Sequence, residues 1–315
     1  MSIHVIVGKG PIGTATARRL LDQGHQVRVV SRKGGPAAAG AESVALNASD
    51  AAALTAAATG AAALYNCANP AYDKWETDWP PLAAALFDTA ERTGAVLATV
   101  GNLYGYGPVT APMTDSTPLA AVGRKGKVRN KMWADALARH RAGRVRVTEV
   151  RGSDYVGPGV TDQGHLGERA VPLLLRGKTV RVLGNPDVPH SWTAVDDVAL
   201  ALVTAAREPQ AWGRVWHVPT APAVSSRQAI TMLCAAAGVA PVKVAPIPPF
   251  ALRAVGVVSP IMRELQEVRH QFSQPFILDS SAFTAQFGIA ATPLADTLAA
   301  TVIWWKQRLA QDAAA

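Results

Sequence analysis

Cysteine is scarce in this chain of 315 residues, which contains only Cys67 and Cys234. Both lie among apolar residues, and the sequence has no Cys-x-x-Cys pair and no Cys/His cluster. His165 and His190 likewise have no second ligand at a spacing typical of metal sites. We therefore expect buried thiols in a reducing compartment, and neither a disulfide framework nor a metal site.

Long apolar runs are also missing. No stretch reaches the roughly 18 apolar residues that suggest a membrane-spanning helix, and residues 37–63 are rich in alanine but too weakly apolar to span a bilayer. The chain begins directly with a predicted strand, without the basic and apolar regions of a secretory signal. We therefore expect a soluble, cytoplasmic protein without a membrane partner.

Acidic residues are in the minority, because 23 Asp and Glu face 31 Lys and Arg and give a net charge of +8. Such a balance can indicate nucleic-acid binding. However, the basic residues are scattered, and the one cluster, at 124–131, has no interleaved aromatic side chains on which bases would stack. We expect no nucleic-acid partner. A phosphorylated cofactor, together with a small substrate that can itself be anionic, explains the positive charge at least as well.

The principal motif is the opening stretch, residues 3–13 (IHVIVGKGPIG), in which an apolar run breaks into Gly8-x-Gly10-x-x-Gly13 before a helical pattern. In such a turn the first glycine permits a sharp bend. The second lets a pyrophosphate approach the backbone, and the third lets the helix pack closely on the sheet. The free N–H groups at the start of that helix then face the phosphates. The motif predicts dinucleotide binding.

The residues after the second predicted strand bear on the choice of cofactor. An NAD site usually places Asp or Glu about 20 residues past the glycines, where it holds the ribose 2′-OH. This chain has Ser31, Arg32 and Lys33 there. A carboxylate would repel a 2′-phosphate, whereas a guanidinium can bind it with two hydrogen bonds. We therefore predict NADP(H) rather than NAD(H); the alternative for Arg32 and Lys33 is a pair of solvated loop charges.

Predicted strands and helices alternate over the first 150 residues, which is typical of a parallel sheet with helices on both faces. We predict an α/β fold, a Rossmann-type doubly wound parallel sheet with a smaller C-terminal substrate lobe. Residues 1–150 form the dinucleotide-binding core. Residues 151–315 form mainly the substrate lobe, with segments that return to the core sheet. Trp304 and Trp305, on a predicted C-terminal helix, are candidates for packing or for contact in a homodimer.

Several motifs occur in an order that resembles the extended and atypical short-chain dehydrogenase/reductases, the NAD(P)-dependent epimerase/dehydratase family. Besides the glycine turn, they are residues 103–105 (LYG), 151–159 (RGSDYVGPG), 192–198 (WTAVDDV) and 276–281 (FILDSS). The resemblance runs over nearly the whole chain. It implies a Rossmann domain, a C-terminal substrate lobe and a nicotinamide cofactor whose reactive ring faces the cleft between them.

The resemblance also implies a catalytic Tyr-x-x-x-Lys motif on a helix and a Ser or Thr on the preceding strand. Residues four apart share a helix face, so the lysine can lower the pKa of the tyrosine, which exchanges a proton with the substrate. Here Lys131 fits the lysine, but Lys127 stands at the tyrosine position. Val100 stands at the hydroxyl position, with Thr99 beside it.

Two catalytic interpretations follow. In one, the protein transfers a hydride without a strong acid, for example to an iminium or a conjugated alkene, and in the other the proton donor is a residue outside the usual motif position or Lys127 itself. The candidates are Tyr104 and Tyr106, which follow one strand, Tyr155, which follows the next, and Lys127 itself, whose alternative is a solvated lysine. The predicted catalytic residues are Lys131, Lys127, Tyr104, Tyr106, Tyr155 and Thr99. The predicted cofactor-binding residues are Gly8, Gly10, Pro11, Ile12, Gly13, Ser31, Arg32, Lys33, Asn66, Cys67, Ala68 and Lys131.

These residues predict an NADP(H)-dependent oxidoreductase that acts on a small organic carbonyl, imine or enone held by residues 151–190 and 245–275. One alternative is a non-catalytic NADP(H)-binding sensor or scaffold. Another is a nucleotide-sugar epimerase or dehydratase, whose chemistry relies on the missing tyrosine. Arg151, at a predicted strand end, either binds an anionic substrate group or forms an internal ion pair.

Overall fold

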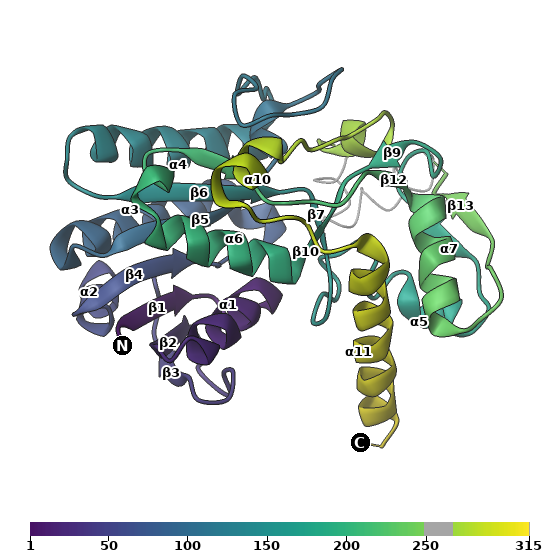
Figure 1. Cartoon of the computed structure of the whole chain (residues 1–315), viewed down its shortest axis with the longest axis horizontal. Coiled ribbons are helices and arrows are strands. Elements are labelled where there is room, and N and C mark those ends of the chain that lie inside the picture. Colours follow the sequence, from purple (N-terminus) through teal and green to yellow (C-terminus); the bar gives the residue numbers. More distant parts are fainter. Residues whose placement is uncertain (249–266, 315) are drawn as a thin grey trace. The chain divides into compact units, whose positions relative to one another are not determined.

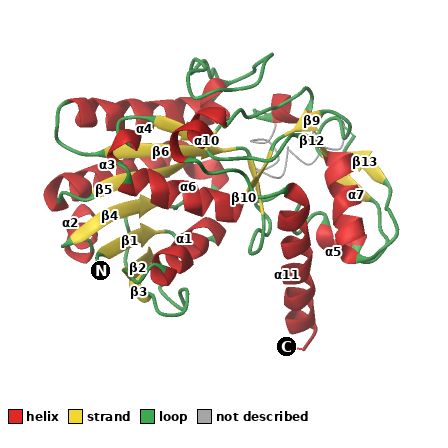
Figure 2. Cartoon of the chain, in the orientation of Figure 1, coloured by secondary structure: helices red, strands yellow, loops and turns green. Residues whose placement is uncertain are grey.

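The structure, a computed structural model, describes residues 1–248 and 267–314 and contains two compact units (Figures 1 and 2). Unit 1 consists of residues 1–107, 117–152 and 196–218, and unit 2 of residues 108–116, 153–195 and 219–315. Residues 249–266, part of the segment predicted to hold substrate, lie outside the described residues. No helix of the described parts is long and apolar enough to cross a membrane.

Unit 1 is built on a seven-stranded parallel sheet in the order β11-β6-β5-β4-β1-β2-β3. The strands are β1 (Ile3–Val7), β2 (Gln26–Ser31), β3 (Glu42–Ala45), β4 (Ala61–Asn66), β5 (Val96–Asn102), β6 (Val147–Gly152) and β11 (Val215–His217). This topology confirms the predicted doubly wound α/β fold. The strand order reverses between β1 and β4, and ligands of such sheets bind at the carboxyl ends of the strands beside this reversal.

Helices cover both faces of this sheet. They are α1 (Pro11–Asp22), α2 (Ala51–Ala57), α3 (Trp75–Thr93), α4 (Arg124–Arg141) and α6 (Val195–Arg207), with short 3-10 turns at Tyr72–Lys74, Tyr104–Tyr106 and Pro209–Ala211. Residues of α2, α3 and α4 share one apolar core with the sheet, and α1 and α6 lie over the opposite face in Figure 1. The carboxylate of Asp50 caps α2 by accepting hydrogen bonds from the N–H groups of Ala52 and Ala53.

In its described residues, unit 2 has three two-stranded pairings and a helical core. The strands are β7 (Asp154–Val156), β8 (Val180–Val182), β9 (Pro189–His190), β10 (Trp192–Ala194), β12 (Val224–Ser225) and β13 (Val244–Pro246), and the helices are α5 (Val171–Leu174), α7 (Ser226–Ala237), α10 (Ser281–Phe287) and α11 (Leu294–Ala314). A 3-10 turn covers Arg269–Phe272. Trp305 of α11 is buried in the core that α5, α7 and α11 share, and Trp304 packs against that core.

His4, in β1, is a buried titratable side chain of unit 1. Its ring lies 2.9 Å from the Ser2 hydroxyl, 3.2 Å from the Tyr65 hydroxyl and 4.6 Å from the ring of His25. Burial, and secondarily the charge of His25, lowers the pKa of His4 from 6.5 to about 4. The unfolded chain therefore binds more protons than the folded chain between these two values.

We expect the free energy of unfolding to fall as the pH drops from about 6.5 to 4, because protons then favour the unfolded state. Replacing His4 with glutamine should make this decline smaller. Urea unfolding of the native and His4→Gln proteins at several pH values measures both slopes. Equal slopes would show that His4 does not contribute.

Candidate functional site

The glycine turn after β1 combines two steric requirements with one open position. Gly8 has φ +110°, and a Cβ there would lie 2.6 Å from the carbonyl oxygen of Cys67. A Cβ at Gly13 would overlap the carbonyl oxygen of Gly8. Gly10, in contrast, has an extended backbone (φ −70°, ψ −175°), and a Cβ there would meet no described protein atom within 4 Å. The fold therefore requires the first and third glycines, whereas the second leaves room for a ligand.

The start of α1 is suited to an anion. Gly10 occupies the position before the helix and therefore offers no side chain to its first N–H groups. Pro11 follows at the first helical position, and no acidic residue lies in the first turn. The N–H groups of Ile12 and Gly13 belong to the first turn, where helices have no internal acceptors. These groups and the helix dipole fit a pyrophosphate.

Three cations lie near the end of β2, two in the loop that follows the strand and one in the glycine turn. Arg32 and Lys33 are exposed, and residues 31–41 contain no carboxylate. The Ser31 hydroxyl donates to the carbonyl oxygen of Gly34 at 3.3 Å. Lys9, inside the glycine turn, donates from Nζ to the same oxygen. Lys9 is not among the residues predicted from the sequence, although its place between two glycines of the turn is a visible signal.

The end of β4 lies against the glycine turn. The Cys67 N–H donates to the carbonyl oxygen of Val7 at 2.9 Å, and the Asn66 side-chain oxygen accepts from the Ala68 N–H at 3.3 Å. Burial raises the pKa of the Cys67 thiol to about 12, so the thiol stays protonated at neutral pH. Cys67 can therefore shape this edge, but it is not an activated nucleophile.

Helix α4 turns the predicted lysine pair to solvent. Lys127 is exposed, and the side chain of Lys131 is 77% exposed and forms an ion pair with Asp135, with 3.0 Å between Nζ and Oδ2. Lys125 and Arg129 are instead 2% and 8% exposed. They also stand four residues apart, so this second basic pair occupies the inward face of the helix.

Packing of apolar side chains explains which face of α4 points inward. The apolar residues that α4 buries are Met132, Trp133 and Ala136. Positions 125 and 129 precede them at the helical spacing of three and four residues, so they share the buried face. Positions 127 and 131 fall outside that stripe.

Four aromatic side chains surround the inward basic pair. The guanidinium of Arg129 lies 4.3 Å from the ring of Trp79 and 4.8 Å from that of Trp75, and it donates to the carbonyl oxygen of Val100 at 3.3 Å. The ammonium of Lys125 lies 4.3 Å from the ring of Tyr72. Such cation–π contacts compensate for burying the charges. Tyr104 completes the group by stacking on Trp75, with 5.8 Å between ring centroids.

Tyr106 lies in a different, fully buried polar network. Its hydroxyl is 2.7 Å from Nε2 of His217, and Arg151 lies 5.2 Å from its ring. Arg151 donates from Nε to Oε1 of Glu149 at 2.6 Å, so of the two roles considered for Arg151 the structure shows an internal ion pair. Burial would lower the pKa of Arg151, but Glu149 and then Tyr106 raise it. This part of the site is closed to solvent.

Tyr155 belongs to unit 2, whereas the other two candidate tyrosines belong to unit 1. Its neighbour Asp154 accepts from His190, with 2.5 Å between Oδ2 and Nε2, and lies 3.6 Å from Nε2 of His165. Burial would raise the pKa of Asp154, but His165 and then His190 lower it overall. The sequence analysis missed this Asp–His group because its members become neighbours only in the folded chain.

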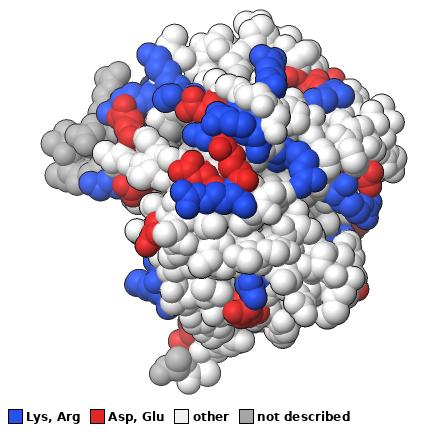
Figure 3. Space-filling model, turned by 90° about the vertical axis from the view of Figure 1, so that its left-hand side faces the viewer, with Lys and Arg blue, Asp and Glu red and all other residues white. Residues whose placement is uncertain are grey.

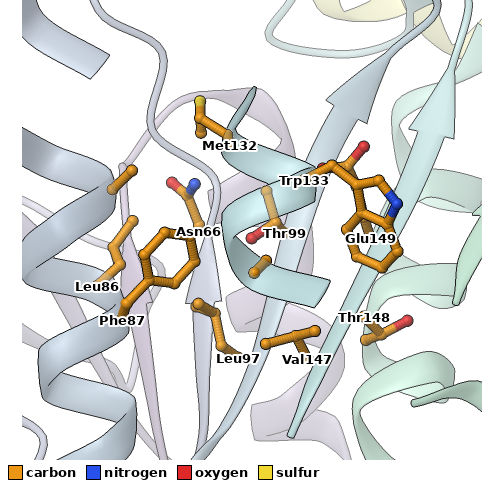
Figure 4. A pocket seen from close by; sticks show the side chains of 12 residues that line it. Asn66, Leu86, Phe87, Leu97, Thr99, Met132, Trp133, Val147, Thr148 and Glu149 are labelled. Atoms are coloured by element: carbon orange, nitrogen blue, oxygen red, sulfur yellow. The ribbon is translucent and has the colours of Figure 1, made fainter. Parts of the chain in front are cut away.

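Thr99 lies beside a small cavity between the sheet and the helices α3 and α4 (Figure 4). The cavity has a volume of about 20 Å³, which suffices for one water molecule. The polar residues that line it are Asn66 of β4, Thr99 of β5, and Thr148 and Glu149 of β6, and Phe87 and Trp133 contribute apolar walls. This space is too small for a substrate.

The basic cluster at 124–131 does not form one charged surface. Arg124 pairs with Glu76 and Lys131 with Asp135, whereas Lys125 and Arg129 point inward. On the face drawn in Figure 3, Lys and Arg side chains are interspersed with Asp and Glu. The helix therefore distributes its charges over several directions.

The fold and the glycine turn define a Rossmann-type dinucleotide-binding protein. The chain belongs to the NAD dependent epimerase/dehydratase family, whose model matches residues 4–218, and this confirms the resemblance drawn from its motifs. The family consists of NAD-dependent enzymes. No curated protein shows significant sequence similarity to the chain.

Solved structures share the fold at low sequence identity. A dTDP-glucose 4,6-dehydratase from Bacillus anthracis, in complex with NAD, is 14% identical with a TM-score of 0.79, over 98% of this chain and 97% of that one. A UDP-glucose 4-epimerase from Thermotoga maritima, with UDP-glucose, is 16% identical with a TM-score of 0.79, over 98% and 99%. A putative epimerase from Burkholderia cenocepacia is 23% identical with a TM-score of 0.74, over 96% and 97%.

Proposed function

We propose that the protein is an NADP(H)-dependent oxidoreductase that acts on a small organic carbonyl, imine or enone. The observation that carries the preference for NADP(H) is a group of three cations near the end of β2. Arg32 and Lys33 belong to the loop after β2, which has no carboxylate, and Lys9 reaches this loop from the glycine turn. A 2′-phosphate is the ligand group that such cations favour, and a guanidinium can bind it with two hydrogen bonds.

The residues of unit 1 fit such a cofactor in three places. The N–H groups at the start of α1 would hold the pyrophosphate, with Gly10 allowing its close approach. The cations after β2 would hold the ribose phosphate. Asn66 and Ala68 would line the edge of the sheet beyond the turn. When bound, the nicotinamide supplies or removes a hydride, and the protein orients the substrate and manages its proton.

Replacing Arg32 with aspartate should weaken NADPH binding by about 1–3 kcal/mol, because a charge-assisted hydrogen bond is lost and a repulsive charge is introduced. NADH binding should change much less, since NADH has no 2′-phosphate. Fluorescence titration of both cofactors gives the two affinities. Lys178→Asp makes the same change of charge at an exposed position of unit 2 and is the control. Unchanged NADPH affinity in Arg32→Asp would refute this role.

A nucleotide-sugar epimerase or dehydratase is the second candidate. It is favoured by the likeness, over nearly the whole chain, to structures solved with NAD or UDP-glucose. If the protein is such an enzyme, UDP- or dTDP-sugars should raise its melting temperature in the presence of the nicotinamide cofactor. Protection by these sugars would favour this candidate, and its absence together with NADPH-dependent reduction of simple carbonyls would favour the oxidoreductase. NADPH binding without turnover on either class would favour a sensor.

A further inference from the structure

The inward lysine of α4 lies against a pair of tyrosines. The ammonium of Lys125 is 4.3 Å from the ring centroid of Tyr72, and the Tyr72 hydroxyl donates to the Tyr104 hydroxyl at 3.3 Å. Lys125 is 2% exposed, whereas both tyrosines are only partly buried. A buried cation and two accessible phenols therefore form one connected group within unit 1.

Neighbouring residues hold this group in place. Trp75 stacks on Tyr104 and makes an edge contact with Tyr72, with 5.5 Å between the latter ring centroids. The first turn of α4 approaches Tyr104 closely, because a Cβ at Gly126 would lie 2.5 Å from the Tyr104 carbonyl oxygen. Asn130 donates from its side-chain amide to the carbonyl oxygen of Gly105 at 3.0 Å. The backbone that carries Tyr104 is thus attached to the helix that carries Lys125.

The arrangement supplies what proton transfer requires. A cation close to a phenol favours the phenolate form, and two phenols in hydrogen-bond contact can pass a proton between them. Tyr104 lies two residues after the last residue of β5, whose carboxyl end lies at the ligand edge of the sheet. Tyr72 follows β4, the neighbouring strand. The two hydroxyl groups therefore belong to segments that follow adjacent strands at the ligand edge of the sheet.

We propose that Tyr104 is the proton donor of the reaction, with Tyr72 as its relay and Lys125 as the cation that stabilises the deprotonated pair. This inference rests on the proposed oxidoreductase function. In carbonyl reduction, the substrate carbon gains a hydride from the reduced nicotinamide and the substrate oxygen gains the Tyr104 proton. The Tyr104 oxygen then takes the proton of Tyr72, and Tyr72 regains one from water. Oxidation of the alcohol reverses each transfer.

Titration of the cofactor-free protein tests the group without any substrate. We compare the ultraviolet absorbance of tyrosinate against pH in the native protein and in Lys125→Met. Loss of the cation should move the ionisation of the tyrosine pair upward by roughly 1–3 pH units. Lys127→Met removes the exposed lysine two positions along α4 and should leave the curve unchanged. Equal curves for Lys125→Met and the native protein, both folded by circular dichroism, would overturn the proposal.

Kinetics provide the second measurement, which does not depend on the folding of Lys125→Met. Tyr104→Phe keeps the ring that stacks on Trp75 and should lower kcat by roughly 10²–10⁴-fold with little change in KM. Tyr72→Phe should lower kcat less and move its pH profile. Unchanged kcat in Tyr104→Phe would overturn the proposal. If kcat is unchanged in Tyr104→Phe and this variant still binds NADPH, only the role of Tyr104 is refuted and the proposed oxidoreductase function stands. If the native protein does not bind NADPH, the proposed oxidoreductase function is refuted.

Discussion

Replacing Glu149 with alanine is expected to lower the free energy of unfolding by about 3–5 kcal/mol, the typical penalty for removing one partner of a buried ion pair. The side chains of Glu149 and Arg151 are only 6% and 4% exposed, and 2.6 Å separates Oε1 from Nε. Both residues stand on β6, two positions apart, so they share a face of the strand. Without the carboxylate, the guanidinium would keep its charge in a buried site that lacks its main counter-ion.

The neighbouring strand accommodates this pair. A Cβ at Gly101 of β5 would lie 2.7 Å from Oε1 of Glu149, so the glycine provides the space that the carboxylate occupies. Urea unfolding of Glu149→Ala measures the loss. The double variant Glu149→Met/Arg151→Met removes both charges and should be markedly less destabilised, because no buried charge is left alone. If the double variant loses as much stability as the single one, the ion pair is not the cause.

Substitutions in the glycine turn should separate folding from ligand binding. In Gly13→Ala the added methyl overlaps the carbonyl oxygen of Gly8, so the turn must shift, and we expect a loss of about 1–3 kcal/mol in stability as well as loss of cofactor binding. In Gly10→Ala the methyl meets no described protein atom and the backbone is extended, so the fold should keep its stability. Cofactor affinity should still fall about tenfold or more, equivalent to about 1.4 kcal/mol.

Thermal unfolding and fluorescence titration of the two variants check this contrast. Gly10→Ala serves as the folding control for Gly13→Ala, because both variants add the same methyl group to the glycine turn. Undiminished NADPH affinity in a folded Gly10→Ala protein would mean that no pyrophosphate passes over this glycine. Equal destabilisation of both variants would contradict the steric account of the turn.

The sequence predicted the sheet and the glycine turn because their signals are local. The alternation of apolar strands with helices and the spacing of Gly8, Gly10 and Gly13 depend only on neighbouring residues. The sequence signal for the end of β2 is equally local, and Ser31 and Arg32 lie at the end of this strand as predicted. Their contact with a phosphate stays a prediction.

Which face of α4 is buried could not be predicted in the same way. Sequence reasoning assigns lysine and arginine to solvent, and the family motif directed attention to Lys127 and Lys131. The burial of Arg129 relies on Trp75 and Trp79, some fifty residues earlier in the chain, whose rings lie against its guanidinium. Lys125 likewise depends on Tyr72. Contacts between distant segments therefore determine which basic residues point inward.

Titration of the purified protein with NADPH and with NADH, followed by fluorescence, tests the central claim most directly. The three cations at the end of β2 predict that NADPH binds at least about tenfold more tightly than NADH, and that raising the salt concentration weakens this preference. Tighter binding of NADH would contradict the proposed role of Lys9, Arg32 and Lys33. Binding of neither cofactor would contradict the assignment of the glycine turn as a dinucleotide site.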